Sequence, residues 1–498
     1  MAQVTEVGKI RRKVFAEIAK LTYEGTLSEK VDEIIQTVVT EDGPRYRCCV
    51  HKERAVLADR IKIALSQPQD VDLHEAAKHA LAGEMADLPI VNVMPEACDG
   101  CPIDKFIVTD ACRNCVAHNC INSCPKNAIM VVQNRAYIDK TKCVECGMCK
   151  RSCQYGAIIE ISRPCERACD IKAIKAGHDR KAVIDSEKCV SCGACKIACP
   201  FGAISDRSMI VQVIEKMKTH KVVAMLAPAF IGQFGPKVRT GQVIEAMKQL
   251  GFAEVYEASF GADIVAIEET KEFLAVKDEQ PFLTTSCCPA FAGMVKKHMP
   301  DIASNVSTTV SPMVATGRVI KHAEPDTMVV FMGPCIAKKG EGLANSEYID
   351  FVLTFEEAAA MMVGKGINVA EMTDSEYVSM ASRDGNVFAR AGGVMQAVLG
   401  TVGELAPETE VKGQRSEGLG ECKMTLLKMK TGKLEANFFE GMACLGGCVG
   451  GPGTLADLRV TTKLVDNYAA TSPLKVSPEN QKAVDEIEKS ISFHHHHE

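Results

Sequence analysis

The sequence contains no tryptophan, and phenylalanine and tyrosine bring its aromatic content to only 5% of 498 residues. It also has no long apolar run, because the longest stretches, such as 222–231, fall well short of the roughly 18 residues that suggest a membrane-spanning helix. Charge of one sign is not in large excess either, with 58 Lys and Arg against 64 Asp and Glu. These features argue against a membrane protein and give no reason to expect a nucleic-acid or membrane-surface binder.

The rest of the composition is that of an ordinary globular protein, with 46% hydrophobic and 24% charged residues. The length corresponds to about three domains, at roughly 150 residues per domain. Arg11 and Arg12 resemble a twin-arginine export signal. However, charged residues follow where the apolar core of such a signal should be, so a helix is the better interpretation. We therefore expect a soluble, cytoplasmic protein.

Cysteine, by contrast, is abundant: the chain has 24, and sixteen of them lie between Cys98 and Cys199. Without a secretion signal, crowded cysteines indicate metal ligation or redox chemistry more often than disulfides. The segment Cys189–Pro200 has the spacing of bacterial ferredoxins, in which three thiolates bind one 4Fe–4S cube and the fourth reaches a second cube. The pattern recurs in Cys143–Cys153 and, more loosely, in Cys112–Cys124. Zinc also binds paired Cys-x-x-Cys, but three four-cysteine runs favour iron–sulfur clusters.

A fourth, degenerate copy contains Cys165 and Cys169 and ends in the same Ala-Ile pair as the other three. The repeats therefore predict two ferredoxin-like modules. Under the rule that the fourth cysteine of a run ligates the other cube, sixteen thiolates make four complete cubes. The predicted sets are Cys112, Cys115, Cys120 and Cys153; Cys143, Cys146, Cys149 and Cys124; Cys189, Cys192, Cys195 and Cys169; and Cys98, Cys101, Cys165 and Cys199. The alternative is that Cys98 and Cys101 are free thiols beside a three-cluster domain.

Residues 112–199 also carry a basic surplus, with 15 Lys and Arg against 8 Asp and Glu. Each oxidised cube with four thiolates carries a charge of about −2, so the clusters can offset this surplus without any nucleic acid. A docking surface for an acidic partner is the second interpretation, and the two are compatible.

We expect a multidomain α/β protein. Residues 1–95 are predicted to be mostly helical, because apolar residues such as Val14 and Ile18 recur at helical spacing. Residues 96–205 would form tandem ferredoxin-like α+β modules. Strands predicted at 222–227, 254–257 and 328–332, with a helix at 241–250, indicate two stacked α/β lobes over residues 206–460. Residues 461–498 would be a helical C-terminal tail whose end, 493–498, is excluded from the site as a tail or tag remnant.

Three segments of the α/β region place cysteine beside glycine or proline: Thr285–Phe291, Met332–Glu341 and Glu440–Gly453. Glycine and proline let the backbone approach an inorganic cluster closely and direct N–H groups at its sulfurs. The five cysteines in these segments therefore indicate one further buried metal site. The glycines do not indicate a phosphate-binding loop, because the Lys-Ser/Thr ending of such a loop is missing.

Taken in order, the three segments resemble the three signature loops of the FeFe hydrogenases, and the resemblance covers roughly residues 206–460. The ferredoxin-like region resembles that family's electron relay, and the loop variants with no sensory domain resemble its group B branch. The resemblance implies an H-cluster between the lobes, in which a 4Fe–4S cube is joined to a dinuclear iron centre with carbonyl, cyanide and azadithiolate ligands. It implies interconversion of two protons and two electrons with dihydrogen, a soluble electron carrier such as ferredoxin or a flavodoxin, and hydrogenase maturation proteins as assembly partners.

The resemblance also implies roles for individual residues. Four cysteines would hold the cube, and the last of them would bridge to the dinuclear centre: Cys288, Cys335, Cys444 and Cys448. Lys338 would donate a hydrogen bond to a cyanide ligand, and Met442 would pack beside the dinuclear iron.

A proton path is implied as well. Cys287 would pass protons to the azadithiolate amine, and Glu269, Glu272 and Ser311 would link Cys287 to solvent. Without the resemblance, an exposed helix face is an equally good interpretation of the two glutamates.

The sequence departs from the family pattern at several positions. Phe291 stands where tryptophan is usual, and Gly333 where a cluster-contacting methionine usually stands. Leu445 replaces a proline, and Val276 stands where an arginine is expected one turn beyond Glu272. These changes are expected to affect the preferred direction of the reaction, its rate and the outer end of the proton path. The cysteine ligands are unchanged.

A dihydrogen sensor and a non-catalytic iron–sulfur assembly protein share this fold and are the alternatives. Retention of Cys287, Lys338, Cys444 and Cys448 favours catalysis. Cys422 is expected to be a structural thiol, and Cys48 and Cys49 to be buried or idle thiols. The sequence does not indicate an oligomeric state.

Overall fold

The computed structural model describes residues 4–43, 46–98, 101, 105–489 and 491–495. At the N-terminus five helices form a small bundle: α1 (Glu6–Tyr23), α2 (Leu27–Lys30), α3 (Glu33–Val38), α4 (Val50–Ala64) and α5 (Leu73–Leu81). The apolar face of α1, which includes Val14 and Ile18, is fully buried. Part of α1 lies against helix α16 (Phe355–Gly364), which belongs to the α/β region of residues 206–460. The two helices approach closely at Gly364, where a Cβ atom would lie only 2.7 Å from the backbone nitrogen of Lys20.

Two ferredoxin-like modules follow, and each consists of two antiparallel strand pairs with short helices. The distal module contains β2 (Phe106–Val108), α6 (Asn119–Asn122), β3 (Ile129–Val132), β4 (Arg135–Ile138), α7 (Met148–Ser152) and β5 (Ile158–Glu160). The proximal module contains β1 (Val91–Val93), α8 (Pro164–Arg167), β6 (Ile174–Ala176), β7 (Ala182–Ile184), α9 (Ala194–Ala198) and β8 (Ile204–Asp206). In both modules the first strand pairs with the last and the two central strands form a hairpin.

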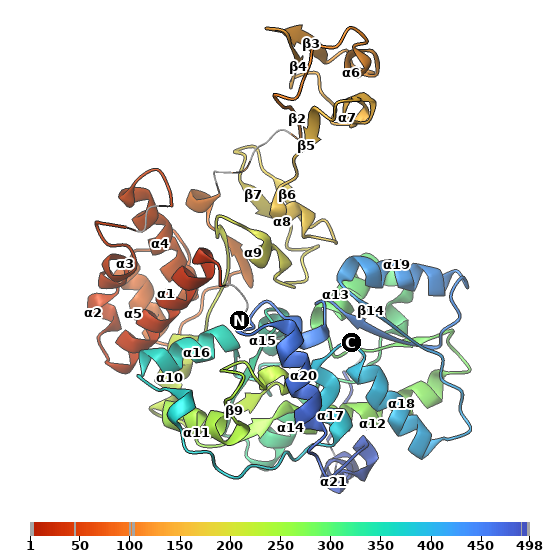
Figure 1. Cartoon of the computed structure of the whole chain (residues 1–498). Coiled ribbons are helices and arrows are strands. Elements are labelled where there is room, and N and C mark those ends of the chain that lie inside the picture. The colour runs from red at the N-terminus through yellow and green to blue at the C-terminus, as the bar shows by residue number, and fades with distance from the viewer. Residues whose placement is uncertain (1–3, 44–45, 99–100, 102–104, 490, 496–498) are drawn as a thin grey trace.

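The predicted pair of ferredoxin-like modules is confirmed, and strand pairing adds a feature that the sequence repeats do not show. Because β1 pairs with β8, the proximal module starts before the distal one and ends after it. The distal module is thus inserted between β1 and α8 rather than simply preceding the proximal module. In Figure 1 the distal module stands at the top, apart from the other parts of the protein.

The α/β region contains two wholly parallel sheets. The first has the strand order β10 (Val255–Glu257), β9 (Val222–Leu226), β12 (Met328–Gly333) and β13 (Phe351–Thr354). The second has the order β11 (Leu283–Thr284), β15 (Phe438–Met442) and β14 (Gly413–Glu417). Strands β9, β10 and β12 match the strands predicted from apolar runs, and every residue of β9 is buried.

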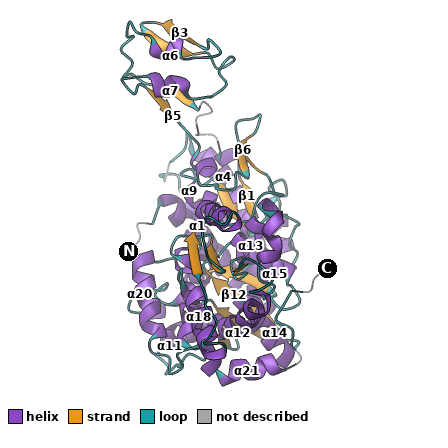
Figure 2. Ribbon diagram, turned by 90° about the vertical axis from the view of Figure 1, so that its right-hand side faces the viewer, coloured by secondary structure: helices purple, strands orange, loops and turns teal. Residues whose placement is uncertain are grey.

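Helices surround these sheets, as Figure 2 shows. They are α10 (Ile210–Met217), α11 (Thr240–Leu250), α12 (Ala258–Val276), α13 (Pro289–His298), α14 (Pro312–Ala323), α15 (Ala337–Ala344), α16, α17 (Arg383–Asn386), α18 (Gly393–Leu405), α19 (Leu419–Lys430), α20 (Leu458–Ala469) and α21 (Gln481–Glu488). Short 3-10 helices lie at Pro95–Ala97, Pro228–Phe230, Pro300–Asn305, Val369–Glu371, Val387–Ala389, Gly447–Gly450 and Ser477–Glu479. No helix in the described ranges is long and apolar enough to cross a membrane.

The expectation that the chain ends in a tail apart from the rest of the protein is wrong for residues 493–495, which pack against it. Phe493 is 2% exposed, and its carbonyl accepts a hydrogen bond from the Val310 N–H at 2.8 Å. The His494 side chain lies within hydrogen-bonding distance of Thr308 and Glu268. The apolar Phe493 and the backbone pairing explain why this segment docks on the α/β region.

Candidate functional site

The signature cysteines follow the carboxyl ends of parallel strands in both lobes. Strand β11 leads to Cys287 and Cys288, and Pro289 then begins α13. Strand β12 ends at Gly333, two residues before Cys335. Strand β15 ends at Met442 and leads to Cys444 and the short helix that contains Cys448. Ligand sites in parallel α/β sheets form at these carboxyl ends, so the two lobes place the cysteines around one region.

The four predicted cube ligands lie close enough to influence one another. Burial, together with the nearby Cys288 and Cys448, raises the pKa of Cys335 to about 12. Burial likewise raises the pKa of Cys444 well above its ordinary value, reinforced by Cys335, Cys288 and Cys448. A cationic iron–sulfur core would displace these protons and stabilise the thiolates. The donor set therefore fits a cluster.

A single metal ion does not fit the same side chains. Within the part of the chain that the structure describes, no three His, Cys, Asp or Glu side chains approach closely enough to hold one ion. A 4Fe–4S cube places iron and sulfide between its thiolates and so separates them more widely than a tetrahedral ion does.

Glycines in the third loop allow it to pack directly on neighbouring loops. Gly447 has a φ of +80°, and a Cβ there would lie 2.5 Å from the Ala391 nitrogen. A Cβ at Gly451 would lie 2.6 Å from the carbonyl oxygen of Pro334, next to Cys335. Residues with side chains would force these loops apart.

Lys338 is buried beside the cysteines and keeps its charge. Its Nζ donates a hydrogen bond to the Cys287 carbonyl at 3.3 Å and forms an ion pair with Glu341 at 2.5 Å. Burial opposes the charge, but the carboxylate of Glu341 outweighs it and raises the pKa of Lys338. Sequence analysis gave Glu341 no role, although its position three residues after Lys338 on α15 is typical of a helical ion pair.

Two further sequence predictions concern residues near the four cysteines. Met442 is 3% exposed at the end of β15, which is compatible with its predicted place beside the dinuclear iron. Phe291, where tryptophan is usual, is fully buried and packs against Phe439 with ring centroids 5.8 Å apart. A Cβ at Gly441 would lie 2.2 Å from the Phe291 ring, so this aromatic already fills the available space.

Two residues of the predicted proton path, Cys287 and Glu269, are both buried. Glu269 accepts a hydrogen bond from the Ser286 N–H at 3.2 Å. Burial, with the nearby charge of Glu272, raises the pKa of Glu269 to about 8. Burial and the charge of Glu269 also raise the pKa of Cys287 well above its ordinary value. The interpretation of Glu269 as part of an exposed helix face is therefore wrong, because α12 is buried along most of its length.

Glu272 is held by the segment before α14. Its Oε2 accepts hydrogen bonds from the hydroxyls of Ser307 at 2.6 Å and Thr309 at 3.1 Å, and its Oε1 from the Thr308 N–H at 2.8 Å. Ser307 also lies close enough to Glu269 to lower its pKa. The hydroxyl of Ser311 is buried without a hydrogen-bond partner among the described residues. Ser307 therefore makes the link between the glutamates, and a role for Ser311 stays a prediction.

The accessory cysteines gather in the predicted sets. One cavity is lined by Cys112, Cys115, Cys120 and Cys153, and another by Cys124, Cys143, Cys146 and Cys149. In the proximal module burial raises the pKa of Cys195, and Cys192, Cys189 and Cys169 raise it further. Burial raises the pKa of Cys165 to about 11, with additional effects of Cys199 and Cys101.

Cys98 has the same surroundings as a cysteine of the regular distal module. The Ala182 N–H in strand β7 donates to Cys98 Sγ at 3.3 Å, and the Ala136 N–H in strand β4 donates to Cys112 Sγ at 3.5 Å. Cys98 thus occupies the position in the proximal module that Cys112 occupies in the distal module. The two positions are not obvious in the sequence, because the distal module is inserted after Cys98. This match favours Cys98 and Cys101 as ligands over free thiols.

The proximal module touches the catalytic loops. A Cβ at Gly193, which has a φ of +79°, would lie 2.7 Å from Ile336 and 2.9 Å from Pro452. Burial raises the pKa of Cys192 to about 11, with a contribution from Cys288. The accessory cysteine set that contains Cys192 therefore lies next to the set that contains Cys288.

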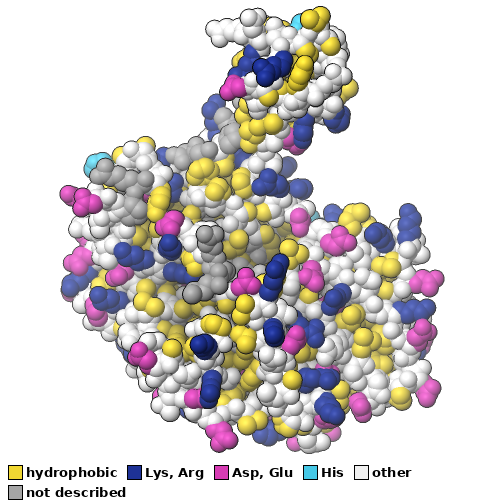
Figure 3. Space-filling model, viewed as in Figure 1, with side chains coloured by type: hydrophobic (Ala, Val, Ile, Leu, Met, Phe, Trp, Pro, Cys, Tyr) yellow, Lys and Arg dark blue, Asp and Glu magenta, His cyan; other side chains and the backbone are white. Residues whose placement is uncertain are grey.

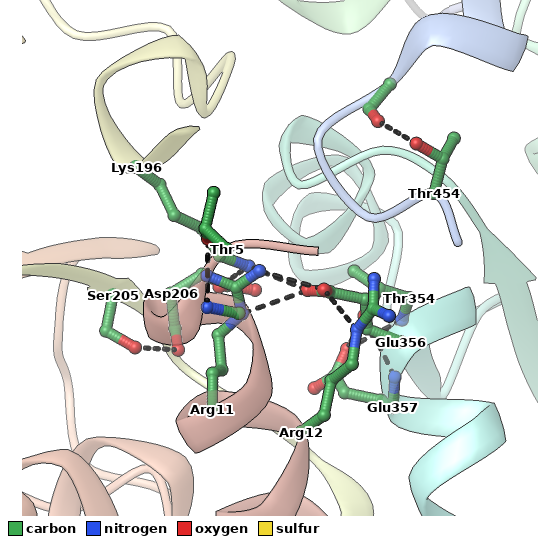
Figure 4. Close-up of polar contacts among 12 residues, drawn as sticks. Thr5, Arg11, Arg12, Lys196, Ser205, Asp206, Thr354, Glu356, Glu357 and Thr454 are labelled. Carbon is green, nitrogen blue, oxygen red and sulfur yellow. Dashed lines mark hydrogen bonds and ion pairs between the residues drawn. The ribbon is translucent and has the colours of Figure 1, made fainter. Parts of the chain in front are cut away.

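A buried ion network fixes this arrangement (Figure 4). Arg11 from α1 donates two hydrogen bonds to Glu356 of α16, at 3.0 and 2.8 Å. Lys196, which follows Cys195, pairs with Asp206 at 2.6 Å and lies 3.6 Å from Glu356. Lys339 pairs with Asp206 at 2.8 Å. The network joins the N-terminal bundle, the proximal module and the catalytic region.

The remaining cysteines differ in their surroundings. Cys422 is fully buried, and its thiol donates to the carbonyls of Ser416 at 3.3 Å and Met442 at 3.6 Å, as expected of a structural thiol. Cys48 and Cys49 are exposed at the start of α4, so of the two alternatives, buried or idle thiols, the first is wrong and the second stays a prediction. The turn before α4 leaves both side chains outside the bundle core.

Comparison with known proteins gives the family. Residues 220–452 match the family described as iron only hydrogenase large subunit, C-terminal domain, and residues 136–159 and 182–205 match the 4Fe-4S binding domain. The chain is 32% identical over 390 residues to the periplasmic Fe hydrogenase large subunit of Nitratidesulfovibrio vulgaris, covering 66% of this chain and 89% of that protein. It is 31% identical over 390 residues to iron hydrogenase 1 of Clostridium pasteurianum, covering 66% and 67%. The chain belongs to the iron-only, or FeFe, hydrogenase family.

Two further matches are more distant. A variant of the FeFe hydrogenase HydA1 from Chlamydomonas reinhardtii superimposes with a TM-score of 0.50 at 23% identity, over 57% of this chain and 95% of that chain. This match shows a shared fold. The cytosolic Fe-S cluster assembly factor narfl of Danio rerio is 25% identical over 264 residues, covering 42% of this chain and 64% of that protein.

Proposed function

We propose that this chain is a hydrogenase that interconverts protons and electrons with dihydrogen at an H-cluster held by Cys288, Cys335, Cys444 and Cys448. The observation that carries the proposal is the convergence of these partly buried thiols from the strand ends of both lobes. When bound, the dinuclear iron centre supplies the metal at which the H–H bond forms or breaks and an amine that exchanges protons.

The chain's own residues would orient the centre and supply protons. The charged Lys338, fixed by Glu341, would attract an anionic cyanide ligand without a covalent bond. Cys287 would hold the proton nearest the centre, and Glu269 would exchange protons with it, because the buried carboxyl keeps its proton near neutral pH.

Four accessory 4Fe–4S clusters, bound by the sixteen cysteines of the two modules, would conduct electrons. The entry point would be the distal module, which exposes apolar side chains such as Val116, Val144 and Tyr155. Figure 3 shows apolar and basic side chains next to one another on this module. Such a surface suits a small acidic electron carrier, such as a ferredoxin or a flavodoxin. Assignment to group B and a cytoplasmic location stay predictions.

A non-catalytic role in iron–sulfur assembly is the second candidate, because the narfl protein named above is a relative. The presence of Cys287 beside a charged Lys338–Glu341 pair favours catalysis, since a scaffold needs no proton donor at the cluster. A dihydrogen sensor would ordinarily have lost this proton-relay cysteine.

The test compares variants of protein produced with the hydrogenase maturation proteins. We expect dihydrogen turnover by the wild type, and loss of most turnover in Cys287→Ala with retained carbonyl and cyanide infrared bands. Cys422→Ala removes another buried thiol and is the matched control, which should keep its turnover. Unchanged turnover in Cys287→Ala would remove Cys287 from the proton path, and a fully matured wild type without turnover would favour the assembly role.

A further inference from the structure

The C-terminal segment 491–495 lies along the residues that surround Glu272. The backbone of this segment pairs with residues 308–310: Val310 N–H donates to the Phe493 carbonyl, and His495 N–H donates to the Thr308 carbonyl, both at 2.8 Å. The Phe493 side chain is buried in the catalytic core. Both interactions fix the position of His494, which lies between these two residues.

The imidazole of His494 joins the protein interior to solvent. Its Nδ1 lies 2.9 Å from the hydroxyl oxygen of Thr308, and its Nε2 lies 3.2 Å from Oε2 of Glu268. The side chain is 37% exposed, whereas that of Glu268 is 12% exposed. One ring nitrogen is thus directed to the interior and the other to a carboxylate near the surface.

Polar groups continue inward from Thr308 toward Cys287. The Thr308 hydroxyl donates to Oε1 of Glu272 at 3.0 Å. Ser307 bridges Glu272 and Glu269, as described above, and Glu269 lies close to Cys287. The order from the surface is therefore His494, Thr308, Glu272, Ser307, Glu269 and Cys287.

The charges around His494 allow the ring to gain and lose a proton. Glu268 and Glu272 face it from α12, and Arg318 faces it from α14. Lys271 pairs with Glu268 at 2.8 Å. The hydrogen bond to Glu268 raises the pKa of His494 above its ordinary value, against the effect of partial burial. Histidine is the side chain best suited to gain and lose a proton near physiological pH.

We propose that His494 is the outermost relay residue of the proton path, exchanging protons between solvent and Glu272 through the hydroxyl of Thr308. This proposal rests on the proposed hydrogenase function. It would give an outer exit to a chain that has Val276 instead of the family's arginine.

The transfer conserves one proton at each stage. A proton from solvent binds Nε2 of the neutral imidazole, and the resulting imidazolium donates its Nδ1 proton to the Thr308 oxygen. The Thr308 hydroxyl proton passes at the same time to the Glu272 carboxylate, which becomes a carboxylic acid. The imidazole is left neutral with its proton on Nε2, and rotation of the ring to solvent, where Nδ1 gains a proton and Nε2 loses one, restores the starting tautomer. The reverse sequence exports a proton.

The experiment uses matured full-length protein with an artificial electron donor in dilute buffer. We expect His494→Ala and His494→Gln to lower turnover about ten- to hundredfold, with unchanged carbonyl and cyanide infrared bands. Added imidazole should restore turnover in His494→Ala. His495→Ala, at the exposed neighbouring histidine, is the matched control and should behave as the wild type. Both His494 variants keep the backbone pairing and Phe493, so the segment stays docked.

Histidine NMR titration of the unmatured protein gives a readout that does not depend on activity. The pKa of His494 should lie above its ordinary value, and Glu268→Gln should lower it. Turnover in both His494 variants equal to that of His495→Ala would overturn the relay, as would a loss that imidazole does not restore. If matured wild type has neither turnover nor infrared bands, the hydrogenase function itself fails, whereas bands with turnover independent of His494 reject the relay alone.

Discussion

The buried carboxyl of Glu269 makes the stability of the protein depend on pH in a way that a single substitution should remove. An unfolded chain releases the glutamate proton near pH 4.5, whereas the folded protein keeps it until about pH 8, mainly because of burial. Between these values unfolding releases a proton, so raising the pH favours the unfolded state. The same retained proton is what allows Glu269 to act as a donor to Cys287 at neutral pH.

The magnitude follows from the two pKa values. Each pH unit in this window changes the free energy of unfolding by about 1.4 kcal/mol. From pH 6 to pH 8 the folded wild type should therefore lose about 2–3 kcal/mol relative to Glu269→Gln, which has no proton to release. Above pH 8 the folded carboxyl ionises as well, and the difference should level off.

Urea unfolding of the unmatured wild type and of Glu269→Gln, followed by circular dichroism at pH 6, 7, 8 and 9, measures this difference. Glu254→Gln is the control, since the pKa of Glu254 is lowered instead of raised, chiefly by its hydrogen bond from Lys221. For Glu254 the unfolded state holds its proton to higher pH, so its contribution is already complete at pH 6. A constant difference between wild type and Glu269→Gln across this range would show that Glu269 is ionised throughout, and would refute the reasoning.

Two further predictions concern assembly. Glu356→Gln removes the anion that faces Arg11 and Lys196, which should destabilise the docking of α1 by about 3–5 kcal/mol and accelerate hydrogen exchange of α1 amides, while Lys9→Gln at the exposed pair on the same helix should not. Fully matured protein should contain about 22 iron atoms, for five cubes and one dinuclear centre. A value of about 18 would show that Cys98 and Cys101 bind no cluster.

The cluster ligands could be predicted from the sequence because their geometry is local. A ferredoxin run fixes three thiolates within a few residues, and its repeat identifies the partner run. The strands that precede the catalytic loops could be predicted in part, because the apolar run of β9 is buried on both sides. Parallel strands end at the same edge, so loops at those ends converge.

Other features depend on long-range packing that leaves little local signal. Helix α12 is apolar around much of its circumference, so its residues show no clear helical stripe that could have predicted it. The insertion of the distal module depends on pairing between β1 and β8, which are more than a hundred residues apart. Ser307 contacts the glutamates where Ser311 does not, because the turn of the backbone before α14 decides which hydroxyl faces α12.

The central claim is that Cys288, Cys335, Cys444 and Cys448 hold one H-cluster. The infrared spectrum of anaerobically matured protein tests it most directly, since protein side chains do not produce the bands of metal-bound carbonyl and cyanide. We predict these bands in the wild type and their loss in Cys335→Ser, which removes one ligand of the cube. Wild-type protein that contains the iron of its cubes and yet shows no such bands after full maturation would contradict the account.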